Sequence, residues 1–147
     1  QATKAEEIST LITFPGEEPD FDDDLGEFGN PEWRGRAIAN VDIGESFGVF
    51  WSTQYIGEQE DIIPPGTTTA DGVATIAAVD EYFVSDASLR YSADDWAVTV
   101  GVRNIFDQEP PLVDQDTTAA VSARNVPLGL GYDQIGRRVF ISASKAF

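Results

Sequence analysis

The sequence lacks several residue types on which common protein chemistry depends. Its 147 residues include no cysteine and no histidine, so it can form no disulfide or thiolate metal site, and it lacks the commonest general base. Histidine-based hydrolytic triads and zinc sites are therefore excluded. Bases are also scarce, since nine Lys and Arg stand against 26 Asp and Glu, for a formal charge of -17. A field of that sign repels nucleic acid, and we expect no nucleic-acid partner.

Long hydrophobic runs are absent as well. The apolar runs cover only a few residues each, far short of the roughly 18 to 20 residues that a membrane-spanning helix needs. A membrane β-strand needs only about 9 to 11 residues with apolar side chains at alternate positions. A membrane helix is thus excluded, but a membrane protein is not. No export signal follows Gln1, and we expect the chain to be a piece of a longer protein.

What the sequence does contain is alternation of apolar and polar residues with a period of two. This pattern predicts strands at about 33–43, 46–56, 81–91, 96–107 and 132–147. Residues 6–14 offer a sixth strand. Turn-rich connections at 57–80 and 108–131 are long and the others are short, while residues 1–32, with ten acids and one base, are expected to form mostly an acidic extracellular loop. The fold class is therefore all-β, an antiparallel meander.

Such a meander fits either a membrane barrel or a soluble sandwich. Long and short connections alternate, as outer loops and periplasmic turns do in outer-membrane barrels. Charged side chains of both signs occupy the side opposite the apolar one, which suits a polar lumen. Aromatic residues mark strand ends, where interfacial girdles would lie: Trp33, Tyr55, Tyr91, Trp96 and Phe147. We favour the barrel; the alternative is a soluble, secreted, acidic β-sandwich that binds calcium or carbohydrate, favoured by the net charge and the short length.

Two stretches resemble the C-terminal part of TonB-dependent outer-membrane receptors. One is Gly101-Val-Arg-Asn-Ile-Phe-Asp-Gln-Glu-Pro-Pro111, and the other is Tyr132-Asp-x-x-Gly136-Arg-Arg138, followed by a strand that ends on the aromatic Phe147. Upstream, residues 29–34 and 55–57 are similar to preceding strands of that family. The resemblance covers about residues 29–147.

The resemblance implies a transporter. It implies a barrel of about 22 strands with a plug in its lumen, of which this chain, without the plug, would form roughly the last five or six strands. The implied location is the bacterial outer membrane, in contact with its lipid. The implied partners are an N-terminal chain with the plug and the remaining strands, the TonB complex acting through that chain, and a small nutrient. A ferric siderophore, cobalamin or an oligosaccharide would be taken up with energy supplied by TonB.

The candidate binding residues are the polar side chains predicted to face the lumen. They could contact the plug, an anionic substrate, or one another across neighbouring strands. Packing on the plug and ion pairing are the favoured interpretations. The set consists of Arg34, Arg36, Asn40, Gln54, Asp86, Arg90, Arg103 and Arg138.

Other candidate sites carry weaker signals. The spacing of Asp20, Asp22 and Asp24 is that of the start of a calcium loop, but the glycine and glutamate that such a loop requires are replaced by Leu25 and Pro31. We therefore favour an acidic solvated loop. The long connections are the expected substrate contacts, because recognition in barrels lies on outer loops. No nucleophile–base pair is apparent, so we expect neither an enzyme nor a cofactor.

Overall fold

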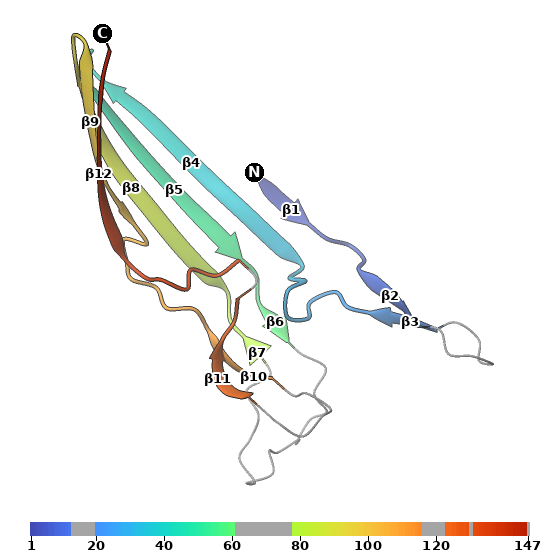
Figure 1. Cartoon of the computed structure of the whole chain (residues 1–147). Helices are drawn as coiled ribbons and strands as arrows, with labels where there is room; N and C mark the ends of the chain where they lie inside the picture. The colour runs from blue at the N-terminus through green and yellow to red at the C-terminus, as the bar shows by residue number, and fades with distance from the viewer. Residues whose placement is uncertain (13–19, 61–77, 116–122, 130, 147) are drawn as a thin grey trace.

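The computed structural model describes residues 1–12, 20–60, 78–115, 123–129 and 131–146, and these ranges contain strands and turns but no helix. Six strands form the main sheet in the order β1-β4-β5-β8-β9-β12 (Figure 1), and neighbours in it are antiparallel. The all-β class and the antiparallel meander are thus confirmed. The strands are β1 Ala2–Lys4, β4 Trp33–Ile43, β5 Phe47–Ile56, β8 Tyr82–Ala93, β9 Trp96–Arg103 and β12 Arg138–Lys145.

The two ends of the sheet are built differently. Tight turns join β4 to β5 and β8 to β9 at one end, the upper end in Figure 1, with Gly44 at φ 63° and Asp94 at φ 43°. The long connections leave from the opposite end and form small two-stranded sheets of their own. These are β2 (Ser9–Ile12) with β3 (Asp20–Asp23), β6 (Gln59–Glu60) with β7 (Ala78–Val79), and β10 (Leu112–Gln115) with β11 (Ala123–Pro127).

The N-terminal segment differs from the prediction. The sixth strand of the main sheet is β1, whose Ala2 pairs with Gly35 of β4, rather than residues 6–14. Ser9–Ile12 instead pairs with Asp20–Asp23 as β2 and β3, so residues 1–32 contain three short strands beside their acidic loops. A three-residue strand is too short to produce a visible alternation, which is why the pattern did not reveal it.

Strand ends near the two family-like stretches also differ from the prediction. β9 stops at Arg103 instead of 107, and β12 starts at Arg138 instead of 132. Asn104 and Asp107 have positive φ angles of 49° and 57°, and Gly136 has φ 81°. Left-handed residues cannot continue a ladder, so the chain turns at these positions. The other predicted strand ends differ by at most two residues. β5 begins at Phe47 where 46 was predicted, and β8 covers Tyr82–Ala93 where 81–91 was predicted.

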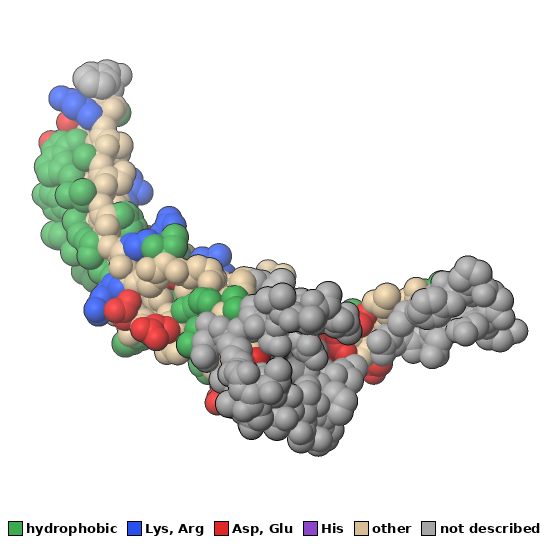
Figure 2. Space-filling model, turned by 60° about the horizontal axis from the view of Figure 1, so that its bottom comes forward, with side chains coloured by type: hydrophobic (Ala, Val, Ile, Leu, Met, Phe, Trp, Pro, Cys, Tyr) green, Lys and Arg blue, Asp and Glu red, His purple; other side chains and the backbone are tan. Residues whose placement is uncertain are grey.

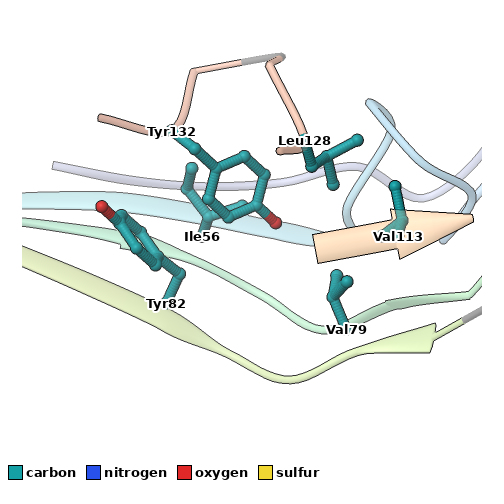
Figure 3. Packing of buried hydrophobic residues seen from close by; sticks show 6 residues of the cluster. All are labelled: Ile56, Val79, Tyr82, Val113, Leu128 and Tyr132. Carbon is teal, nitrogen blue, oxygen red and sulfur yellow. The ribbon is translucent and has the colours of Figure 1, made fainter. Parts of the chain in front are cut away.

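The buried hydrophobic core lies at the end with the long connections. Ile56 and Tyr82, at the ends of β5 and β8, meet Val79, two residues of the connection 108–131, Val113 and Leu128, and Tyr132 directly after that connection (Figure 3). The Tyr82 and Tyr132 rings pack edge to face with centroids 4.9 Å apart. The connection therefore folds back over one face of the sheet at its rim, and the rest of the sheet has no such cover within the described residues.

Candidate functional site: the concave face and its rim

All eight predicted binding residues lie on one face of the main sheet. Residues directly opposite each other in an antiparallel pair point to the same face. The register pairs Arg36 with Gln54, and Arg138 with Arg103. Alternation along each strand places Arg34, Asn40, Asp86 and Arg90 on that face as well. The shared face is thus confirmed, whereas what it binds stays a prediction.

The sheet is curved, and its two faces differ in chemistry. In Figure 2 hydrophobic side chains gather along the outer, convex side of the curved sheet, and Lys and Arg side chains project from the inner side. We call the two sides the convex face and the concave face. The polar set lies on the concave face, which is also the side onto which the core residues Ile56 and Tyr82 project.

The arginines of the concave face do not form the cross-strand ion pairs that were one predicted outcome. Arg34 donates to the Gly29 carbonyl at 2.8 Å, and Arg36 donates to Ser52 Oγ at 3.5 Å. The guanidinium of Arg103 lies 5.8 Å from the centre of the Phe140 ring. Among the described residues Arg36, Arg90 and Arg103 have no carboxylate partner within ion-pair distance. Their charges are therefore available to a group from outside the described chain.

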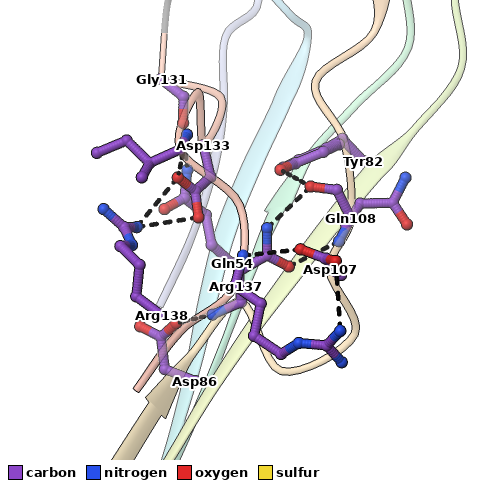
Figure 4. A network of polar contacts seen from close by, with 11 residues as sticks. Gln54, Tyr82, Asp86, Asp107, Gln108, Gly131, Asp133, Arg137 and Arg138 are labelled. Atoms are coloured by element: carbon purple, nitrogen blue, oxygen red, sulfur yellow. Dashed lines mark hydrogen bonds and ion pairs between the residues drawn. The ribbon is translucent and has the colours of Figure 1, made fainter. Parts of the chain in front are cut away.

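Arg138 is the member of the set that does form an ion pair. One of its terminal nitrogens lies 3.0 Å from both carboxylate oxygens of Asp133 (Figure 4), in the stretch just before β12. Its Nε is buried and has no partner within the described chain. The guanidinium is fixed against the rim, so we assign Arg138 to the rim rather than to the open part of the concave face.

The two family-like stretches meet each other at the rim. Asn104 is fully buried, its backbone N–H donates to Asp86 Oδ1 at 3.0 Å, and its side-chain amide exchanges two 2.8 Å hydrogen bonds with the backbone of Gln108. These bonds satisfy the polar groups that a tight turn leaves unpaired. The turn after β9 is thereby tied to the neighbouring strand β8.

Asp107 and Arg137 join the two stretches. Asp107 Oδ1 accepts the backbone N–H of Arg137 at 2.8 Å, and Oδ2 lies 3.4 Å from the Arg137 guanidinium (Figure 4). A Cβ on Gly136 would lie 3.1 Å from Asp107 Oδ1, and its φ is positive, so glycine suits this position twice over. These contacts pack the two stretches against each other at the rim.

Tyr132 connects the rim to the core. Gln59 donates to the Tyr132 hydroxyl at 2.5 Å, and its carbonyl oxygen accepts the Gly29 N–H at 2.6 Å. Burial raises the pKa of the Tyr132 hydroxyl, against smaller lowering effects of Arg34 and of the Gln59 hydrogen bond. The hydroxyl therefore stays protonated at any ordinary pH.

The convex face carries aromatic residues at both ends and mostly aliphatic residues, together with Trp51, between them. Towards the short turns Tyr91 packs on Phe47 and Trp96, with ring centres 4.9 and 5.5 Å apart. Towards the long connections Tyr55 packs on Phe83 at 4.9 Å. The predicted positions Trp33, Tyr55, Tyr91 and Trp96 thus lie at strand ends, while Phe147 is outside the described residues. Val49, Leu89, Val98, Val100, Val139 and Ile141 occupy the middle.

Sequence reasoning missed some parts of the site. The rings of Phe50 and Phe140 lie on the concave face, where alternation alone predicts polar residues. Asp133 as the partner of Arg138 could not be inferred, because the turn that brings them together depends on Gly136. Only the departure of Phe50 and Phe140 from the apolar–polar pattern could have marked them.

The remaining predicted sites stay predictions. Asp20–Asp23 is a strand, the side chains of Asp20 and Asp22 lie outside the described residues, and Asp24 accepts a hydrogen bond from Thr10. No group of acidic residues suited to a metal ion occurs in the described ranges. Most of the connection 57–80 and residues 116–122 of the second connection also lie outside them.

Comparisons with models of protein families, with curated proteins and with solved structures found no match to this chain. In the ranges that the structure describes, no helix is long and apolar enough to cross a membrane. Any function must therefore be argued from the two faces of the sheet, its edges and its rim.

Proposed function

We propose that the chain is a wall segment of an outer-membrane active transporter of the TonB-dependent receptor type. The observation that carries the proposal is the uncovered convex face, apolar in the middle and aromatic at both ends. Val139 and Ile141 are each 74% exposed and Val41 is 54% exposed. Soluble monomers rarely leave contiguous apolar patches larger than a few hundred Å² in water. Hydrocarbon is the solvent that this face fits, with the aromatic ends at the two interfaces.

Strand length supports the same placement. β4 has 11 residues and β5 has 10. At roughly 3.4 Å per residue and a tilt of about 45°, strands of this length cover roughly 25 Å, the height of the apolar band of outer-membrane barrels. The short turns would then lie on the periplasmic side, and the rim with its long connections would face outward.

The edges of the sheet support a partner chain. Beyond the pairing of β1 with residues 33–35, the outer edge of β4 has no further strand beside it in the described chain, and β12 pairs on one side only. Each unpaired backbone group facing lipid costs several kcal/mol, roughly. We therefore propose that an N-terminal polypeptide supplies the remaining strands of a barrel of about 22 strands and the plug inside it.

In this arrangement the concave face lines the passage. The nutrient, which we propose to be a ferric siderophore, cobalamin or an oligosaccharide, binds at the outer rim and passes along the lumen when TonB moves the plug. The residues of this chain hold the wall and contact plug or cargo, and we assign them no catalytic role and no cofactor.

The test is fractionation of cells that make the protein, followed by purification. We expect the chain in the outer-membrane fraction, released only by detergent and together with a larger polypeptide. A chain that leaves the membrane in aqueous buffer as a monomer would contradict the proposal and favour the soluble β-sandwich. Uptake of the co-purified nutrient in cells with and without TonB then tests the transport step.

A further inference from the structure

The concave face contains a pocket that the proposed function leaves unassigned. Its volume is about 350 Å³, within the range of sites for small organic molecules. It spans β4, β5, β8, β9 and β12, and it shares no lining residue with the hydrophobic core at the rim. Its lining consists of Arg36, Phe50, Asp86, Ala87, Ser88, Arg103 and Phe140.

The register explains why the face is hollow at this place. One row across the sheet runs from Phe50 through Ser88 and Gly101 to Phe140. Ser88 leaves the space between the two rings open, and Gly101 leaves room for the Phe140 ring. The Phe140 ring leans over Gly101, where a Cβ would come within 2.5 Å of the ring atom Cε1. The Phe140 ring can occupy this position only because Gly101 has no side chain.

The charge of the pocket favours an anion. Arg36 and Arg103 contribute two positive charges and Asp86 one negative charge, and Asp86 Oδ1 already accepts the Asn104 N–H. Neither arginine has an ion-pair partner among the described residues. A guanidinium offers several N–H donors in a planar fork that matches a carboxylate. The pocket thus presents two guanidinium groups that have no ion-pair partner among the described residues, beside two apolar rings.

We propose that this pocket binds a small organic monoanion that has a carboxylate and a flat apolar body. The carboxylate is held by Arg36 and Arg103, and the body lies between the rings of Phe50 and Phe140. The inference rests on the proposed function in one respect, because the concave face must be open to solutes, as the lining of a passage is. Inorganic phosphate lacks the apolar body and would leave both rings unused.

The test uses the full chain in neutral detergent, together with any polypeptide that co-purifies, and benzoate as the probe. Ligand-observed NMR at low ionic strength follows binding of benzoate, of neutral benzamide and of acetate, which has the charge without the ring. We expect saturable binding of benzoate, with benzamide and acetate weaker by roughly tenfold, because each lacks one half of the recognition.

Variants locate the binding. Arg36→Gln and Arg103→Gln should each weaken benzoate binding about tenfold, and Ser88→Phe, which fills the space between the rings and keeps both arginines, should abolish it. Arg137→Gln is the matched control, since Arg137 pairs with Asp107 at the rim, outside the pocket, and it should leave binding unchanged. Absence of saturation, equal binding of benzamide, or an equal loss in Arg137→Gln would overturn the proposal. Benzoate binding by a chain found in the aqueous fraction would preserve the pocket and reject the transporter.

Discussion

At the scale of single residues, Gly101 decides how the concave face is shaped. A Cβ at this position would collide with the Phe140 ring and lie 2.8 Å from the Ser88 Cβ. Phe140 in turn supports the guanidinium of Arg103 through a contact of 5.8 Å to the ring centre. One missing side chain therefore sets the positions of a ring and of a charge on two neighbouring strands.

Gly101→Ala should destabilise the folded chain by roughly 1 to 3 kcal/mol, the usual cost of forcing a methyl group into a filled space. The measurement is the free energy of unfolding in urea, in the detergent used for purification. Gly129→Ala is the matched control, because no atom lies within 4 Å of a Cβ at that position. Adding Phe140→Ala to Gly101→Ala should recover part of the loss, and the absence of any recovery would show that Phe140 is not the obstacle.

Tyr132 gives the rim a dependence on pH. Its pKa is raised from the ordinary value of 10.0, mainly by burial, so the folded chain keeps a proton that the unfolded chain releases. Stability is therefore complete below about pH 10 and falls as the pH rises from there through the folded-state pKa. Tyrosinate absorbance and the urea midpoint, followed through alkaline pH, should change together, and this coupling should weaken in Tyr132→Phe. A urea midpoint that does not change with pH in the native chain would contradict this reading.

At the scale of elements, β9 separates the two faces most clearly. Val100 lies on the convex face, 47% exposed and opposite Leu89 and Ile141, and the adjacent Thr99 lies on the concave face opposite Arg90. The same substitution at two neighbouring positions thus reports on two different environments.

In the proposed transporter, Val100→Asp should prevent assembly into the outer membrane, while Thr99→Asp should be tolerated. An acid against hydrocarbon costs up to about 2 kcal/mol, whereas at position 99 it gains Arg90 as a neighbour. The measurement is the amount of each variant in the outer-membrane fraction. Equal amounts of the two variants would argue against lipid on the convex face.

The elements also indicate what a sequence can predict and what it cannot. Alternation located β4, β5 and β8 to within two residues and placed all eight polar candidates on one face, because period and register follow from the pleat. It overran at residues 104–107 and 132–137, where Asn, Asp and Gly adopt left-handed backbone that no hydrophobic pattern encodes. It missed β1, and it could not foresee that Asp133 returns to Arg138.

At the scale of the whole molecule, the buried core lies at one end of the sheet. Along the rest of the sheet, many side chains of both faces are exposed within the described residues. The core joins the rim to the ends of β5 and β8. Along the rest of the sheet, hydrogen bonds between strands and contacts between side chains of neighbouring strands hold the strands together. Because the sequence contains no cysteine, a single introduced cysteine can be labelled to test which face is exposed to water.

Ile141→Cys and Ser142→Cys place a thiol on the convex and the concave face of the same strand, β12. In the proposed transporter a charged, membrane-impermeant maleimide should label position 142 and spare position 141. Position 141 should be spared because lipid covers the convex face in that arrangement, and a thiol in hydrocarbon forms little of the reactive thiolate. Both thiols should react equally after unfolding in urea, which is the control. Equal labelling of the two folded variants by the charged reagent would point to water on both faces.

The exposed apolar side chains of the convex face also affect the newly synthesised chain while it is still in water. Folding in water would leave Val139 and Ile141 exposed, since no other part of the described chain shields them. Exposed strand edges and apolar surface promote aggregation of newly made polypeptides. If the chain inserts into a membrane as proposed, aggregation threatens it most between synthesis and insertion, and factors that bind extended apolar segments would then determine its yield.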